Sequence, residues 1–131
     1  MNNQKIWTTE AIPDQHGKTV LITGANAGLG YESSRVLASK GAQVIMACRN
    51  LERGEQAQQS ILAELPSAQL DLRQCDLADI PALKHFAEGV QKDYPRLDIL
   101  LNNAGMNLLR RFENSAGYEM TFATNYLGPF A

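Results

Sequence analysis

VLITGANAGLG, at residues 20–30, joins an apolar, strand-like run to a turn that contains three glycines. The residues after it have a helical pattern that ends before Gly41, so a helix is expected over 29–40. A tight turn between a strand and a helix exposes the first backbone N–H groups of the helix, and these attract an anion together with the helix dipole. Glycine suits such a turn because a Cβ atom would block the approach of a phosphate. The stretch predicts a phosphate-binding loop, with an ordinary glycine-rich turn as the alternative.

Strand-like and helical patterns alternate along the rest of the chain. Four short aliphatic or β-branched runs are expected as strands: Thr19–Thr23, Gln43–Cys48, Gln69–Cys75 and Asp98–Leu101. Two further helices are expected, one over 51–65 with Asn50 as its N-cap, and one capped by Asp79 with apolar positions at 83, 86, 87 and 90. This alternation predicts right-handed crossovers and a parallel sheet with helices on its faces. The third strand alternates apolar and polar residues, so it is expected at a sheet edge.

The composition is that of one globular domain. The 131 residues are 44% hydrophobic and carry a formal net charge of -2, which gives no reason to expect nucleic acid or an anionic membrane as a partner. No apolar run approaches the roughly 20 residues of a membrane helix, and no secretory signal is visible. Cys48 and Cys75 lack metal-ligand spacing, so two buried, reduced thiols and a cytoplasmic location are expected. Residues 1–18 are expected to form a polar arm, with Trp7 as a packing anchor, and residues 19–131 the nucleotide-binding domain.

Arg49 follows the second strand, where an acidic side chain commonly binds the ribose hydroxyls in dinucleotide-binding folds. Cys48 offers no such acceptor, and a cation just before a helix N-terminus is electrostatically unfavourable. A bound anion would remove that conflict, and the 2′-phosphate of NADP is such an anion. A charge-assisted contact of this kind contributes about 1.5–3 kcal/mol. We therefore predict that Arg49 and Asn50 bind the 2′-phosphate, with a solvent-exposed arginine as the alternative.

Two further turns are candidates for the same site. Asp76 and Leu77 follow the third strand, where the carboxylate could accept the adenine amine and the leucine could cover the ring; an aspartate here could also be a turn former. NNAG, at residues 102–105, ends the fourth strand, which neighbours the first in a doubly wound sheet. Turn formation is again the alternative, but this turn should open beside the glycine loop, where ligands bind in such sheets.

Together these motifs resemble the short-chain dehydrogenase/reductase family. TGANAGLG is similar to its cofactor loop, CDL to its adenine pocket, NNAG to its motif of the same letters, and GYEMTFATNYLGPF to the helix that carries its catalytic asparagine. VIMACRN and the residues before the glycine loop resemble the retinol dehydrogenase and protochlorophyllide reductase-like branch, which favours NADP(H). The resemblance implies a Rossmann-type, doubly wound α/β fold with strand order 3-2-1-4, and hydride transfer between nicotinamide and an alcohol or carbonyl substrate.

The resemblance also assigns the site residues. Those expected to bind the cofactor are Gly24, Asn26, Ala27, Gly28, Leu29, Gly30, Arg49, Asn50, Asp76, Leu77, Asn102, Asn103, Ala104 and Gly105. Asn125 corresponds to the catalytic asparagine, and no metal site is expected.

The chain departs from the family in lacking the Tyr-x-x-x-Lys pair that carries the proton transfer. Its four tyrosines are followed, four positions later, by Arg35, Asp98, Phe122 and Phe130. We therefore expect the N-terminal piece of a longer enzyme, inactive alone and truncated before the second half of the sheet. It would self-associate through the exposed fourth strand or the adjacent helix. The alternative is a non-catalytic nucleotide-binding or scaffolding module that completes its sheet with a partner.

Overall fold

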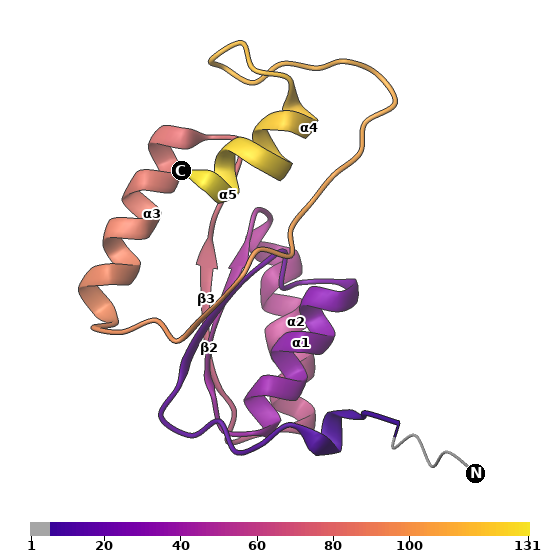
Figure 1. Cartoon of the computed structure of the whole chain (residues 1–131), viewed down its shortest axis with the longest axis vertical. Helices are drawn as coiled ribbons and strands as arrows, with labels where there is room; N and C mark the ends of the chain where they lie inside the picture. Colours follow the sequence, from indigo (N-terminus) through magenta and orange to yellow (C-terminus); the bar gives the residue numbers. More distant parts are fainter. Residues whose placement is uncertain (1–5) are drawn as a thin grey trace.

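A four-stranded parallel sheet organises the protein, whose computed structural model describes residues 6–131 (Figure 1). β1 (Thr19–Thr23) pairs with β2 (Gln43–Cys48) on one side and β4 (Ile99–Leu101) on the other, and β3 (Gln69–Gln74) pairs with β2. The order β3-β2-β1-β4 confirms the predicted 3-2-1-4 arrangement. β3 and β4 are each one residue shorter than predicted. Cys75 and Asp98 nevertheless continue the ladder, donating their backbone N–H groups to Cys48 and Thr19 at 3.0 and 2.9 Å.

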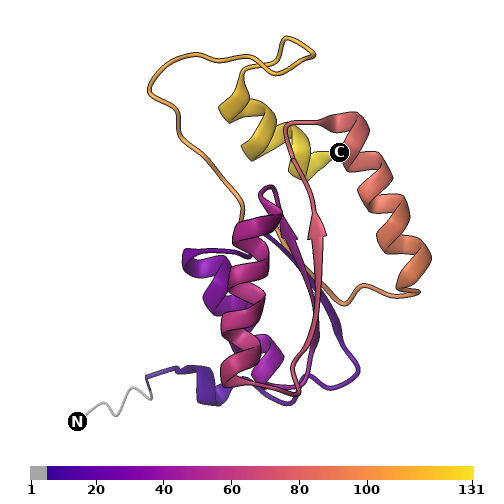
Figure 2. The same cartoon turned by 180° about the vertical axis from the view of Figure 1, so that it is seen from behind.

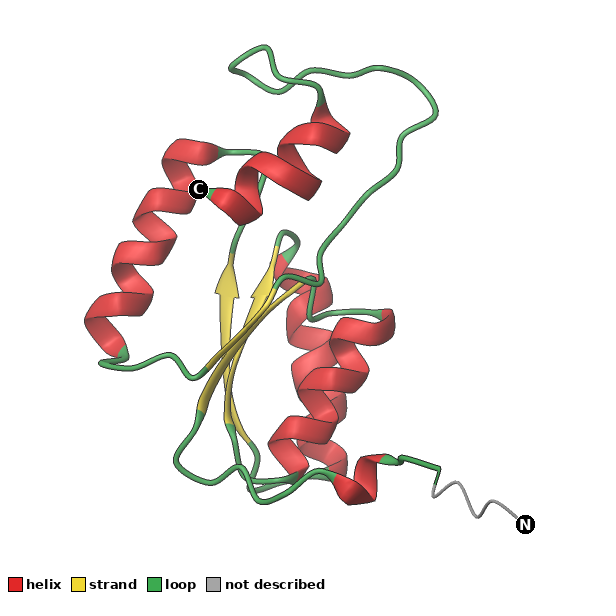
Figure 3. Ribbon diagram, in the orientation of Figure 1, coloured by secondary structure: helices red, strands yellow, loops and turns green. Residues whose placement is uncertain are grey.

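Helices cover both faces of the sheet (Figures 2 and 3). α1 (Gly28–Ser39) and α2 (Leu51–Glu64) lie on one face, and α3 (Ile80–Asp93) lies on the other. The last helix lies near the carboxyl ends of the strands and approaches the start of α3 with its α5 end; it consists of α4 (Met120–Phe122), the π-helical segment η2 (Ala123–Leu127) and α5 (Gly128–Phe130).

The helix boundaries have the predicted chemical causes. Asn50 caps α2, because its Oδ1 accepts the N–H of Arg53 at 2.9 Å, and Asp79 caps α3 by accepting the N–H of Ala82 at 3.0 Å. Gly41 ends the α1 turn with φ +92°, in the left-handed region that favours glycine.

Alternate residues of the central strands fill two hydrophobic cores. Towards α1 and α2, the fully buried side chains include Val20, Ile22, Val44, Met46 and Ile61. Towards α3, the core is formed by Leu21, Ile45, Ala47, Cys75, Leu77 and Val90. β1 and β2 are therefore buried on both faces, which explains their almost continuous apolar sequences.

The edge strands differ from the central ones as predicted. β3 is only partly buried along its length, and β4 leaves Leu100 52% exposed. One side of β4 has no neighbouring strand within residues 6–131.

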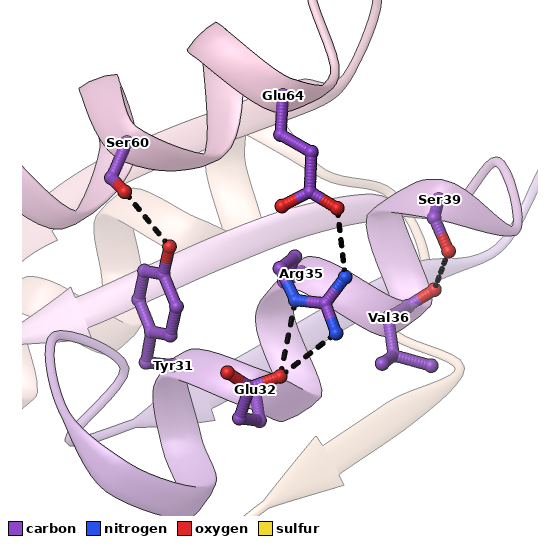
Figure 4. A network of polar contacts seen from close by, with 7 residues as sticks. All are labelled: Tyr31, Glu32, Arg35, Val36, Ser39, Ser60 and Glu64. Carbon is purple, nitrogen blue, oxygen red and sulfur yellow. Dashed lines mark hydrogen bonds and ion pairs between the residues drawn. The ribbon is translucent and has the colours of Figure 1, made fainter.

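Polar contacts tie α1 to α2 at their outer surface (Figure 4). The Tyr31 hydroxyl lies 3.0 Å from the Ser60 hydroxyl. The Arg35 guanidinium binds Glu32 of its own helix and Glu64 of α2, both at 2.9 Å. Such exposed ion pairs contribute little stability each, so they mainly fix how the two helices sit against each other.

The segment before β1 is attached by a residue other than the predicted one. Trp7 is 69% exposed, so the prediction of a packing anchor was wrong. Gln15 is buried instead, and its backbone N–H donates to the Lys40 carbonyl at 2.8 Å, at the end of α1. Residues 1–5 of the expected arm lie outside the described residues. From residue 6 onward, no helix combines the length and apolar character needed to cross a membrane.

Candidate functional site

Three turns meet at the carboxyl edge of the sheet and border a cleft of about 350 Å³. These turns follow β1, β3 and β4; the turn after β2, with Arg49 and Asn50, and Arg53 of α2 form a further wall. The lining residues are Thr23, Gly24, Asn26, Ala27, Ala47, Arg49, Asn50, Arg53, Cys75, Asp76, Leu77, Asn103, Ala104, Gly105, Met106 and Thr124.

The N-terminus of α1 lacks a side-chain cap. Its N-cap residue, Ala27, has extended backbone with no side-chain acceptor, so the amides of the first turn of α1 have no side-chain partner there. Gly28, the first helical residue, has φ +54°, and a Cβ built on it would meet nothing within 4 Å. Leu29 is 80% exposed. The start of α1 therefore presents unused N–H donors and a positive dipole end, which suits a phosphate.

Gly30 has a different role from Gly28. A Cβ on Gly30 would lie 2.2 Å from the Gly24 carbonyl oxygen and 2.5 Å from the Asn103 side-chain nitrogen. Gly24 itself has φ +65° and lies against Ala104. These two glycines let the loop fold closely onto the turn after β4, whereas Gly28 leaves space above the loop.

Asn103 and Thr23 tie the two turns together. The Asn103 side-chain amide donates to the carbonyls of Thr23 and Gly24 at 3.0 and 3.3 Å. In return, the Thr23 hydroxyl accepts the backbone N–H groups of Asn103 and Ala104 at 3.1 and 3.0 Å. The predicted meeting of the NNAG turn with the glycine loop thus rests on four hydrogen bonds. Asn102 is exposed and borders a separate hollow beside α3, so the structure does not bring it to the cleft.

Two arginines border the cleft beside the second strand. Arg49 and Arg53 both line it, and neither guanidinium forms an ion pair within the described chain. The side-chain oxygen of Asn50 accepts the Arg53 N–H and so caps α2, which leaves only the N–H groups of its side-chain amide for a ligand. Sequence reasoning missed Arg53. No sequence pattern marks it, because Arg49 precedes α2 whereas Arg53 lies in its first turn, and only the folded turn brings both to the cleft.

The Cys48 thiol contacts the glycine loop at the backbone of Ala25 and Asn26. Burial raises the pKa of its thiol to about 11, although hydrogen bonds from the backbone N–H groups of Ala25 and Asn26 oppose the rise. Burial also raises the pKa of the Cys75 thiol to about 11. Both residues are free and buried, as predicted, and uncharged near neutral pH. They add no negative charge to a site that faces an anion.

Asp76 and Leu77 form the opposite wall. One oxygen of the Asp76 carboxylate accepts the N–H of Ala78 at 2.9 Å, so its turn-forming role is real. Leu77 is buried and lines the cleft. Gly128 packs directly on Leu77, because a Cβ on Gly128 would lie 2.3 Å from the Leu77 carbonyl oxygen.

Asn125 fixes the last helix to the segment after β4. Its Oδ1 accepts the Met106 N–H at 2.8 Å, and its Nδ2 donates to the Met106 carbonyl at 2.7 Å. The side-chain amide is used on both sides, and Asn125 does not line the cleft. In this chain it positions the rim formed by Gly105 and Met106.

The comparisons with known proteins agree with this geometry. The family model of short chain dehydrogenase matches residues 18–131. Retinol dehydrogenase 12 of Bos taurus is 43% identical over 114 residues, which is 87% of this chain and 36% of that protein. A crystal structure of an uncharacterized protein from Mycobacterium paratuberculosis has a TM-score of 0.83 and 39% identity, covering 95% of this chain and 43% of the other. A metagenomic short-chain oxidoreductase in complex with NADP has a TM-score of 0.77 and 29% identity, covering 88% and 53%.

These matches confirm the resemblance drawn from the motifs. The chain spans only 36% of the length of the retinol dehydrogenase. The matched region nevertheless takes in all four strands, the glycine loop, the NNAG turn and Asn125. The chain belongs to the short-chain dehydrogenase family.

Proposed function

We propose that this chain binds NADP(H) in the cleft and forms the cofactor-binding part of an oxidoreductase. The reaction would transfer hydride between the nicotinamide and an alcohol or carbonyl substrate, and NADP(H) would supply or accept that hydride. The observation that carries the proposal is an α1 N-terminus without a side-chain cap beside two guanidiniums that form no ion pair among residues 6–131. The complex of a related short-chain oxidoreductase with NADP supports it.

The described residues fit such a cofactor in chemical terms. The amides at the start of α1 would hold the pyrophosphate, and the glycine at position 28 leaves room for its approach. Arg49, Arg53 and the Asn50 amide would bind the 2′-phosphate. Asp76 and Leu77 would hold the adenine, while residues 103–105 would border the ribose side. Asn125 would keep that border in place through Met106.

Titration of the chain with NADPH and NADH tests the proposal. Arg49→Ala should weaken NADPH by about tenfold to hundredfold, because one charge-assisted contact is lost, and should leave NADH nearly unchanged. Arg53→Ala should act in the same direction. The matched control is Arg110→Ala, an exposed arginine outside the cleft, which should change neither affinity. Equal NADPH and NADH affinities in the unmodified chain, or no loss in Arg49→Ala, would contradict the 2′-phosphate assignment.

The chain alone should bind the cofactor without turnover, since it has no Tyr-x-x-x-Lys pair. The substrate class remains that of the family, an alcohol or a carbonyl compound.

An alternative role as a non-catalytic module that pairs with another chain has its own support. The free side of β4 carries the half-exposed Leu100, and three aromatic rings stack along the last helix: Phe122 on Tyr126 at 5.3 Å and Tyr126 on Phe130 at 6.3 Å between centroids. We propose that these surfaces cause self-association. Sedimentation velocity over a wide concentration range tests this: a rise in sedimentation coefficient is expected, and a constant monomer value would exclude it.

A further inference from the structure

The hydroxyl of Thr124 stands apart from the other buried polar groups. Thr124 lies in the π-helical segment η2 and is 8% exposed. Its Oγ1 is the one buried side-chain nitrogen or oxygen in residues 6–131 that has no hydrogen-bond partner. Leaving a buried hydroxyl unpaired is unfavourable, and proteins usually avoid it. Thr124 is nevertheless one of the residues that line the cleft, together with Asp76, Leu77 and the turn after β4, so its hydroxyl lies just behind the cleft surface.

The position of the hydroxyl is fixed from two directions. The neighbouring residue, Asn125, is held on Met106 by two hydrogen bonds at 2.8 and 2.7 Å. One helical turn later, Gly128 packs so closely on Leu77 that no side chain larger than hydrogen fits. Thr124 and Gly128 are four residues apart and lie on the same side of the helix. The helix that carries Thr124 is therefore held against the wall to which Leu77 belongs.

The Thr124 hydroxyl also lacks the usual internal partner of a helical threonine. A helical threonine commonly satisfies its hydroxyl by donating to a backbone carbonyl one turn earlier. No such bond forms at Thr124, which lies where α4 gives way to the π-helical segment. Thr121, in the same helix, does have a partner, since its hydroxyl accepts the Leu108 N–H at 3.4 Å.

We infer that the Thr124 hydroxyl is a specificity-determining contact to the adenosine end of the bound dinucleotide. The inference rests on the proposed function, because the wall it shares with Asp76 and Leu77 is the one assigned to adenine. A hydroxyl both donates and accepts, so it can pair with a ring nitrogen, an exocyclic amine or a ribose hydroxyl. Ligand binding would then satisfy a group that the protein leaves unpaired.

Thr124→Val tests the inference because it should raise the stability of the chain and weaken its binding of the dinucleotide. Valine keeps the shape and removes the unpaired hydroxyl, so the melting temperature of the chain without cofactor should rise by about 3–6 °C. The dissociation constants of NADPH and of 2′,5′-ADP should rise by the same factor, about two- to tenfold. Thr124→Ser retains the hydroxyl and should restore the affinity. Calorimetric titration and thermal unfolding provide the two readouts.

Thr121→Val is the matched control. It removes a hydroxyl that has a partner, so it should lower the melting temperature and leave both affinities unchanged. An effect of Thr124→Val on NADPH without the same effect on 2′,5′-ADP would overturn the adenosine assignment. Unchanged affinity for both ligands, or parallel losses of stability and affinity as in a packing defect, would overturn the role of the hydroxyl. If the unmodified chain bound neither ligand, the proposed function would fail and this inference with it.

Discussion

The N-termini of α1 and α3 lie at the same edge of the sheet, yet they are built differently. Each helix follows a parallel strand, β1 or β3, so both first turns face the carboxyl side. The N-cap of α3 is Asp79, whose carboxylate accepts the Ala82 N–H, whereas the N-cap of α1 is Ala27, whose side chain has no acceptor. Under the proposed function, the difference means that an anion site requires more than a helix end. It requires an end whose donors the protein has left unused.

The largest expected effect comes from closing the space on which the α1 turn depends. Gly30→Ala places a Cβ 2.2 Å from the Gly24 carbonyl oxygen and close to the Asn103 amide. We expect a loss of about 1–3 kcal/mol from overpacking and about 1 kcal/mol more from weakened Asn103 hydrogen bonds, together with loss of NADPH binding. Urea denaturation and fluorescence titration measure the two effects.

Gly28→Ala is the control for that substitution. Its Cβ would meet nothing within 4 Å, so only the positive φ adds strain, about 1 kcal/mol. If both substitutions destabilised the protein equally, close approach between the two turns would not explain Gly30.

An intermediate effect is expected from giving α1 the cap that α3 has. Ala27→Asp should stabilise the chain by about 1 kcal/mol, since the backbone of residue 27 is already extended as a cap requires. It should also weaken NADPH by about tenfold to hundredfold, because the carboxylate takes the donors and repels phosphate. Calorimetric titration and urea denaturation measure the opposed changes.

Ala27→Asn separates the two causes in that experiment. The neutral amide should stabilise the helix to a similar extent and weaken NADPH less than the carboxylate does. Tighter NADPH binding by Ala27→Asp would show that the amides at this end do not bind the pyrophosphate.

The smallest effect is expected from removing the cap of α3. Asp79→Ala should cost about 1 kcal/mol of unfolding free energy, because it leaves the Ala82 N–H without its acceptor. NADPH affinity should stay unchanged, since residue 79 does not line the cleft. Urea denaturation and NADPH titration of the same preparation measure the stability and the affinity. A clear change of affinity would mean that the two helix ends are not independent.

The fold could be predicted from the sequence because its signals are local. Asn50 and Asp79 cap the helices that they precede, and the alternation in β3 marks an edge strand. The residues that sequence reasoning missed depend on contacts between distant segments. Arg53 reaches the cleft from inside α2, and Thr124 does so through the π-helical turn, neither of which has a sequence pattern of its own.

Two further differences between the sequence-based predictions and the structure also arise from the three-dimensional arrangement of the chain. Trp7 was expected to anchor the N-terminal segment because large aromatic side chains are usually buried, but the segment is held by the backbone of Gln15. Asn102 and Asn103 are adjacent and chemically identical, yet only Asn103 reaches the cleft, since neighbouring residues at a strand end point in opposite directions. The sequence motif names both, and only the three-dimensional turn distinguishes them.

The bonds between Thr23 and Asn103 have a consequence for the order of events during synthesis. The two residues are 80 positions apart, and β1 lies between β2 and β4. β1 therefore acquires β4 as its second neighbour only after about 80 further residues have been synthesised. Until then the glycine turn lacks the hydrogen bonds from the turn after β4. Contacts of such long sequence separation form slowly. The earliest-made part of the nucleotide crevice is accordingly among the last to reach its final shape.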